Sequence, residues 1–261
     1  MRCLTLVIAA ALSISACTSS GTPRKPQEAS AKSTSRKQNT LYSLTLMRQG
    51  SQFLQQGRFD AALQKFEEAN ELAPGNATTF NMIGLCHLRL GEYDRALAAF
   101  TKSINLVPAF TDAVNNRGAT YLAMGQYRMA EVDFTTVLTD STYPHRWNTF
   151  YNLGMTYLQQ GLAGPAEENF RNAVKGQQPV YEAYLRLAKL AQDRGANDEA
   201  VTWLEEATFT YPTEPEAALQ LGRLLVLLGR RDEATPYLQR VVDSHPGSDM
   251  ADEANALLEG S

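Results

Sequence analysis

Residues 84–108 read GLCHLRLGEYDRALAAFTKSINLVP. The segment opens with a glycine and holds a second one, Gly91, seven residues later. Phe100 follows Ala96 by four residues, so the two side chains lie on one face of a helix. Gly91 is suited to end a helix because a residue without Cβ adopts a left-handed cap conformation, and Pro108 stops the next helix. The segment therefore predicts two short helices joined at Gly91.

The same order of residue types recurs along most of the chain. At intervals of 34 residues, with one interval of 36, a small residue occurs at Gly50, Gly84, Gly118, Gly154, Ala188 and Gly222. Turn glycines follow at Gly57, Gly91, Gly125, Gly161, Gly195 and Gly229. Bulky residues lie at Phe66, Phe100, Phe134, Phe170, Leu204 and Leu238. A period of 34 residues with this order is that of the tetratricopeptide repeat.

Each such repeat is a pair of antiparallel helices that cannot bury its apolar faces alone, so stacked neighbours complete the core. The pattern predicts an all-α solenoid, a right-handed superhelix of six repeats over residues 43–76, 77–110, 111–144, 147–180, 181–214 and 215–248. A short amphipathic helix within residues 249–261 is expected to cap the last repeat, because terminal repeats need a polar outer face. The two extra residues in segment 139–147 predict a local opening between two three-repeat halves.

The first sixteen residues are expected to lie outside the fold. A positive start at Arg2 precedes an apolar run from Cys3 to Ile14, which is shorter than the roughly 20 residues of a membrane span. This arrangement predicts a signal peptide over residues 1–16.

The end of this run, residues 14–17, reads Ile-Ser-Ala-Cys and resembles the lipobox of bacterial lipoproteins. The resemblance implies that Cys17 is acylated and carries palmitate as part of a firm lipid anchor. Thr18 follows the cysteine, and under the sorting rule of enterobacterial lipoproteins a residue other than Asp implies the outer membrane. An ordinary secretory signal that ends in cysteine is the alternative.

Residues 17–40 are expected to form the lipidated cysteine and a flexible linker. Residues 18–40 hold no aliphatic residue larger than alanine and so cannot build a core. Five basic residues and one acidic residue make this segment positive. We expect a solvated spacer, with contact to anionic lipid headgroups as the alternative.

Composition and motifs argue against an enzymatic function. The net charge of −4 does not indicate a nucleic-acid binder. The three histidines, His87, His145 and His245, show no metal-ligand spacing. The sequence also has no phosphate-binding glycine loop and no nucleophile elbow. It therefore predicts a binding protein rather than an enzyme, without a cofactor, metal or small-molecule substrate.

The first helix of each repeat is expected to line a concave groove. At the groove positions the first four repeats carry leucine, methionine, tyrosine and asparagine, which suit an extended peptide or an amphipathic helix. The candidate partner-binding residues are Leu44, Met47, Leu54, Asn81, Leu85, Leu88, Asn115, Leu122, Tyr151 and Met155. The alternative is that some of these side chains belong to the core. Repeats 5 and 6 turn charged at these positions, and basic residues are too sparse to favour a carboxylate clamp.

Four short segments resemble the PilF/PilW pilotin family and the social-gliding protein Tgl. They are the Tyr-Pro pair at 143–144 and residues 151–154, 166–170 and 187–191. The resemblance implies an outer-membrane lipoprotein that faces the periplasm and binds secretin subunits of the type IV pilus, promoting their localisation and multimer assembly. The alternatives are a scaffold for peptidoglycan hydrolases like NlpI and a component of outer-membrane protein assembly like BamD.

Overall fold

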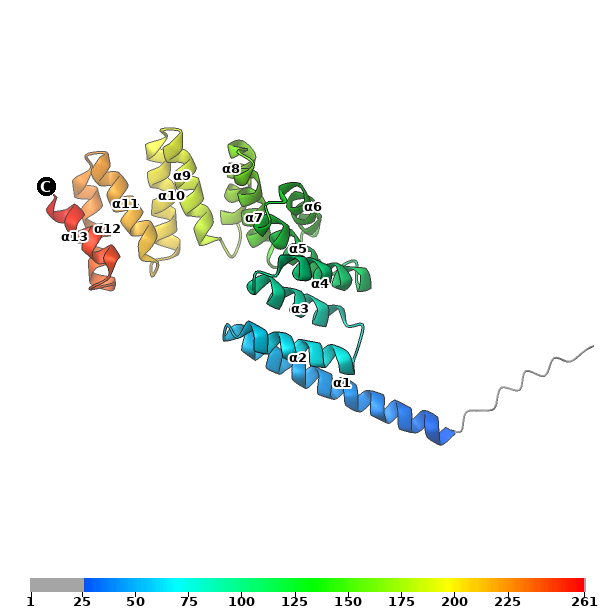
Figure 1. The fold of residues 1–261 in the computed structure, drawn as a ribbon. Helices are drawn as coiled ribbons and strands as arrows, with labels where there is room; N and C mark the ends of the chain where they lie inside the picture. The colour runs from blue at the N-terminus through cyan, green and yellow to red at the C-terminus, as the bar shows by residue number, and fades with distance from the viewer. Residues whose placement is uncertain (1–25, 261) are drawn as a thin grey trace, which may run out of the picture.

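The computed structural model describes residues 26–260 of the chain. Within that range the fold consists of thirteen α-helices and no strand (Figure 1). The expected signal peptide over residues 1–16 and the expected lipid-bearing Cys17 lie outside the described residues. None of the helices between residues 26 and 260 combines the length and hydropathy that a membrane span requires.

Twelve of these helices form six antiparallel pairs, one for each predicted repeat, and we call the two members helix A and helix B. The pairs are α1 (Pro26–Gln55) with α2 (Phe59–Leu72), α3 (Ala77–Arg89) with α4 (Tyr93–Leu106), α5 (Thr111–Ala123) with α6 (Tyr127–Leu138), α7 (Arg146–Gln159) with α8 (Ala163–Val174), α9 (Tyr181–Asp193) with α10 (Asn197–Thr210), and α11 (Pro215–Leu227) with α12 (Arg231–Ser244). The last helix, α13 (Asp249–Glu259), is the expected C-terminal cap. The predicted all-α solenoid is confirmed.

A glycine with positive φ separates helix A from helix B in every repeat. The φ angles lie between 71° and 78° at Gly57, Gly91, Gly125, Gly161, Gly195 and Gly229. Only glycine adopts this left-handed conformation without strain from a Cβ atom. The turn glycines therefore fix where each helix A ends.

A second glycine, inside helix A, lets helix B approach closely. A Cβ added at Gly84 would lie 2.6 Å from the ring of Phe100 in the same repeat. The corresponding contact joins Gly50 to Phe66 and Gly154 to Phe170. These phenylalanines are completely buried. Each ring therefore packs first against helix A of its own repeat, and not only toward the next repeat.

Helix α1 shows that the flexible linker expected over residues 17–40 is wrong for its second part. The helix begins at Pro26, so residues 26–40 are helical. Proline is favoured at a first helical position, and no glycine or proline follows it until Gly50. The part of α1 that packs on α2 supplies the costly helix nucleus, and each further residue is then added at little cost. Composition alone did not reveal this extension.

The junction between repeats 3 and 4 is closed, against the expectation of a local opening. Tyr143 is buried in the inserted segment, and its hydroxyl donates a hydrogen bond to Asp112 Oδ1 at 2.8 Å. Phe134 of α6 and Leu153 of α7 share one hydrophobic cluster. The two extra residues are thus absorbed in the connection, and the stack continues across it.

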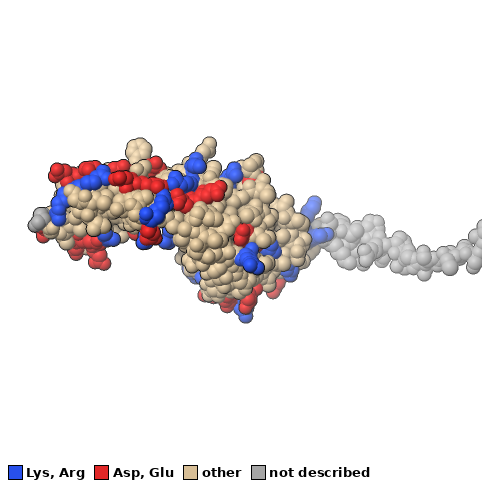
Figure 2. All heavy atoms as spheres, turned by 90° about the horizontal axis from the view of Figure 1, so that it is seen from above, with Lys and Arg blue, Asp and Glu red and all other residues tan. Residues whose placement is uncertain are grey.

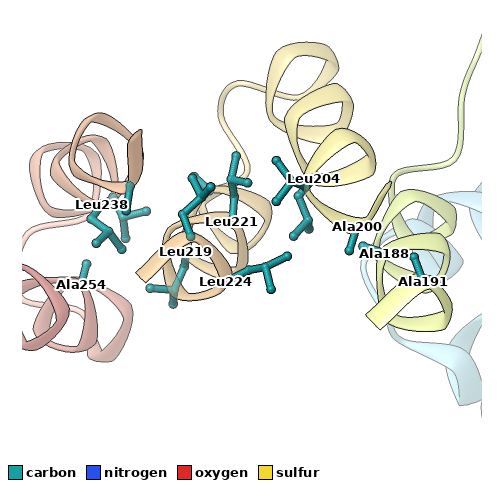
Figure 3. Packing of buried hydrophobic residues seen from close by; sticks show 14 residues of the cluster. Ala188, Ala191, Ala200, Leu204, Leu219, Leu221, Leu224, Leu238 and Ala254 are labelled. Carbon is teal, nitrogen blue, oxygen red and sulfur yellow. The ribbon is translucent and has the colours of Figure 1, made fainter. Parts of the chain in front are cut away.

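The C-terminal repeats build their core from leucine and alanine. Figure 3 shows a continuous band of side chains that includes Leu204 of α10, Leu238 of α12 and Ala254 of α13. The Ser248 hydroxyl caps α13 by accepting a hydrogen bond from a backbone N–H at 3.2 Å. Helix α13 therefore covers the apolar end that the sixth repeat would otherwise expose.

Candidate protein-binding surface

The A helices line the inner wall of the curved array. Neighbouring A helices contact each other from α1 to α7, whereas the pairs α7 with α9 and α9 with α11, like neighbouring B helices, make at most marginal contact. Side chains on the exposed side of α1, α3, α5 and α7 therefore face one shared concave surface. The candidate residues chosen from the sequence all lie on these helices.

The structure divides the apolar candidates into two groups. Five are half-buried and pack against the hydrophobic clusters, namely Met47, Leu54, Leu122, Tyr151 and Met155. The ring of Tyr151, for example, lies 5.7 Å from that of Phe170. Their contacts support the alternative that they belong to the core, because packed side chains offer less surface to a partner.

Three leucines of repeats 1 and 2 remain available on the wall. Leu44 is exposed on α1. Leu85 and Leu88 are half-buried on α3 and belong to none of the hydrophobic clusters. The apolar part of the inner wall is therefore shorter than the sequence suggested, and its binding role stays a prediction.

The two candidate asparagines serve contacts between repeats. Asn81 is only 2% exposed, and its Oδ1 accepts a hydrogen bond from Asn116 Nδ2 at 3.1 Å. Asn115 Oδ1 accepts a hydrogen bond from Thr149 Oγ1 at 2.9 Å. The expectation that Asn81 holds a partner backbone is therefore corrected. Residues about one period apart face each other across neighbouring A helices, and the repeat length itself could have indicated this pairing.

A hollow on the inner wall of repeats 5 and 6 was missed by the sequence reasoning. It has a volume of about 340 Å³ and is lined by Lys189, Gln192, Gln220, Arg223, Leu224 and Leu227. Lys189 pairs with Asp193, and Arg223 pairs with Glu253. The cations in this hollow are thus already neutralised by carboxylates of the same chain. The sequence feature that could have indicated this hollow is a basic residue at the same position of two successive repeats, Lys189 and Arg223.

Charged side chains gather over the C-terminal repeats on the face drawn in Figure 2. Arg171 of α8 donates hydrogen bonds to Glu167 at 2.7 Å and to Glu199 of α10 at 2.5 Å. Arg194, which directly follows α9, donates to the same two carboxylates. Hydrogen bonds from Arg194 and Trp203 lower the pKa of the Glu199 carboxyl, with the nearby Arg171 charge adding to the effect. This network joins α8, α10 and the turn after α9, and so spans the repeat 4–5 junction.

Three parts of the chain match the family model of the tetratricopeptide repeat, at residues 47–110, 151–215 and 185–249. The chain belongs to the tetratricopeptide repeat family. No match is found among curated proteins.

Solved structures of other tetratricopeptide repeat proteins have a similar fold. PilF of Pseudomonas aeruginosa matches with a TM-score of 0.68 and 21% identity, covering 85% of this chain and 98% of that one. PilW, a widely conserved type IV pilus biogenesis factor, matches with a TM-score of 0.67 and 19% identity, covering 81% and 97%. YrrB, which has an unusual peptide-binding site, matches with a TM-score of 0.51 and 22% identity, covering 73% and 97%. At these identities the similarity shows the fold.

Metal binding and thiol chemistry require particular groupings of titratable side chains. Among residues 26–260, no group of three or more His, Cys, Asp and Glu side chains could hold a metal ion. Cys86 is a free, buried cysteine. Burial raises the pKa of its thiol to about 12, so the nucleophilic thiolate is scarce at neutral pH. The tetratricopeptide repeat fold supports contacts with another protein.

Proposed function

We propose that this tetratricopeptide repeat protein binds secretin subunits of the type IV pilus and promotes their localisation and multimer assembly at the outer membrane. The observation that supports it most is the likeness to PilF and PilW, which covers 85% and 81% of this chain and nearly the whole of theirs. Six repeats with a C-terminal cap form one continuous array. PilW is itself a type IV pilus biogenesis factor.

The proposed contact surface is the inner wall of repeat 2, where Leu85 and Leu88 lie one helical turn apart on α3. An amphipathic helix or extended segment of the secretin would bury these leucines while its polar side stays in water. Asn81 does not take part, because it is buried and its side chain joins two repeats.

The proposed mechanism is capture near the membrane. An acylated Cys17 would hold the array at the periplasmic face of the outer membrane. Each bound secretin subunit would then be confined to a thin layer, and its effective concentration for assembly would rise without any new contact between subunits.

The test is a pull-down of the secretin from membrane extracts with wild-type protein and with Leu85→Gln combined with Leu88→Gln. Glutamine retains helix propensity but removes the apolar surface. We expect loss of secretin capture with the helical fold and a cooperative melt retained, at a somewhat lower midpoint because both leucines are half-buried. The control is Leu106→Gln with Val107→Gln. These two exposed apolar residues are the last residue of α4 and the residue that follows it. Wild-type capture by the Leu85/Leu88 variant would refute the surface assignment.

Deletion of the gene tests the function itself. Lost pili and monomeric secretin are expected. Altered wall cross-linking with normal pili would instead favour a scaffold for peptidoglycan hydrolases, and misassembled outer-membrane proteins would favour a component of their assembly.

A further inference from the structure

Helix α1 exposes large apolar side chains beside the region that the repeats bury. Leu41, Tyr42 and Leu44 are 67%, 59% and 54% exposed. No described repeat precedes α1, so nothing in the described part of the chain covers this helix from the N-terminal side. Leu41 and Leu44 are three residues apart on the helix, so they share one face and form a local apolar patch that solvation alone does not favour, whereas Tyr42 points to another side.

The contacts of α1 show which side of the helix this patch occupies. Ser43, Leu46 and Gly50 are buried, and the Ser43 hydroxyl donates a hydrogen bond to the carbonyl of Ala69 in α2 at 2.9 Å. Arg36 also lies on the packed side, because it lines a hollow of about 460 Å³ with the connection after α2. The opposite side of α1 is therefore free.

Four exposed residues follow that free side at helical spacing: Lys37, Leu41, Leu44 and Arg48. Successive members are four, three and four residues apart, which keeps them on one face. The row is about 16 Å long at 1.5 Å per residue. We call it the basal face.

The charge of this region has one sign. No aspartate or glutamate occurs between residues 29 and 59, although the whole chain carries a net charge of −4. In Figure 2 the atoms next to the grey trace include blue ones and no red ones on the face shown. The two cations of the basal face flank the two leucines. A surface that is negatively charged outside and apolar beneath would be complementary to this arrangement.

We propose that the basal face lies on an anionic phospholipid surface. Leu41 and Leu44 enter the boundary between headgroups and acyl chains, while Lys37 and Arg48 contact lipid phosphates. The long stems of lysine and arginine allow their charges to reach the headgroups from beside the leucines. The contact adds to the lipid anchor of the proposed function but requires neither acylation nor the secretin, and 23 residues lie between Cys17 and Leu41.

The test is co-sedimentation with vesicles by the chain from residue 17 onward, which keeps every described residue, with Cys17→Ser so that no acyl group is attached. We expect binding to vesicles of equimolar phosphatidylglycerol and phosphatidylcholine, and at least about tenfold weaker binding to phosphatidylcholine alone, because each cation contributes measurably near an anionic surface. Equal binding to both vesicle types, or no binding, would overturn the proposal.

Two variants and two matched controls locate the contact. Leu41→Glu with Leu44→Glu, and Lys37→Glu with Arg48→Glu, are each expected to weaken binding to the anionic vesicles by about tenfold or more. Met129→Glu with Val132→Glu changes a pair of similar exposure and equal spacing on α6, at 48% and 59%. Arg128→Glu with Arg186→Glu makes the same change in net charge at two other exposed positions. Both controls should bind as the parent does.

Secretin capture, measured on the same variants, separates this proposal from the proposed function. Lost vesicle binding with normal capture supports a lipid contact. Normal vesicle binding with lost capture would show that the basal face docks a protein and would overturn the lipid assignment. Equal loss of vesicle binding in the controls would reduce it to a non-specific effect of charge.

Discussion

The contact between Gly84 and Phe100 shows how one absent side chain sets the distance between two helices. The ring is completely buried, and a Cβ on residue 84 would lie 2.6 Å from it. Glycine is unfavourable inside a helix, and alanine would normally improve such a position by about 1 kcal/mol. Here the gain is opposed by overpacking, because the buried ring has little room to move.

We therefore expect Gly84→Ala to lower the free energy of unfolding by about 1–2 kcal/mol. The matched change is Gly164→Ala in the first turn of α8, where an added Cβ meets nothing within 4 Å. That variant should be neutral or more stable by up to about 1 kcal/mol. Urea unfolding of the two variants provides the measurement, and the same sign for both would contradict the packing explanation.

Arg117 and Asp133 form an ion pair inside repeat 3. Arg117 Nε and Nη2 donate hydrogen bonds of 2.8 and 2.7 Å to the two oxygens of Asp133. These bonds raise the pKa of the Arg117 guanidinium. The Asp133 carboxylate is almost inaccessible to water, so the hydrogen bonds and charge of Arg117 replace the stabilisation that water would give it.

Arg117→Met should consequently destabilise the protein by about 3 kcal/mol, since it leaves a buried carboxylate without a cation. Adding Asp133→Asn removes that charge and should recover most of the loss. Thermal or urea melts of the single and double variants measure the difference. If the double variant were no more stable than the single one, loss of packing rather than of charge would explain the effect.

At the scale of the elements, an ion-pair network supports the junction between α8, α9 and α10. The Glu199 carboxyl has a lowered pKa in the folded protein because Arg194 and Trp203 donate hydrogen bonds to it and Arg171 lies nearby. A lowered pKa means that the unfolded chain binds a proton more readily than the native one. The stabilisation is present above the unfolded pKa and is lost as the pH falls through the folded value.

We expect the free energy of unfolding to decrease below about pH 4.3, the ordinary pKa of glutamate. In Glu199→Gln this decrease should be smaller, because glutamine cannot take up the proton. Urea melts at a series of pH values between neutral and acid conditions measure the slope. Glu206→Gln, on the exposed side of the same helix, serves as the control and should retain the wild-type slope.

Helix α1 shows how one element depends on the next. Residues 26–40 have the composition of a spacer, but they continue a helix whose C-terminal part is fixed against α2. The basal face exists only because this part of the chain is helical, since Lys37, Leu41, Leu44 and Arg48 would not align in a coil.

At the scale of the whole molecule, each repeat is expected to be stabilised by its interfaces with the neighbouring repeats. The cap α13 contacts α12 and α11, and Ala251 and Ala254 are buried against them. Removing residues 249–261 would expose this apolar end without touching the other repeats.

Hydrogen exchange tests this expectation. In the shortened chain, amides of α11 and α12 should exchange faster, while those of α3 and α4 keep their rates. A uniform increase along all repeats would instead show that the array unfolds as one cooperative unit.

The spacing of glycines, alanines and bulky residues by itself determined the helix pairs, the turns and the stack. Each of these features arises within one repeat, from whether a residue has a Cβ atom and whether a side chain four positions away is large enough to fill the gap. The apolar wall was also foreseeable in part, because Leu44, Leu85 and Leu88 lie on the predicted helices.

Only the tertiary structure decided which wall residues remain free. Whether Asn81 is exposed depends on Asn116 in the next repeat, and whether Met155 is available depends on how tightly repeats 4 and 5 pack. The closed junction between Phe134 and Leu153 and the hollow beside Arg223 likewise arise between repeats. Periodicity fixes the order of side chains along a helix, but burial is set by neighbouring repeats, whose curvature and contacts no single period contains.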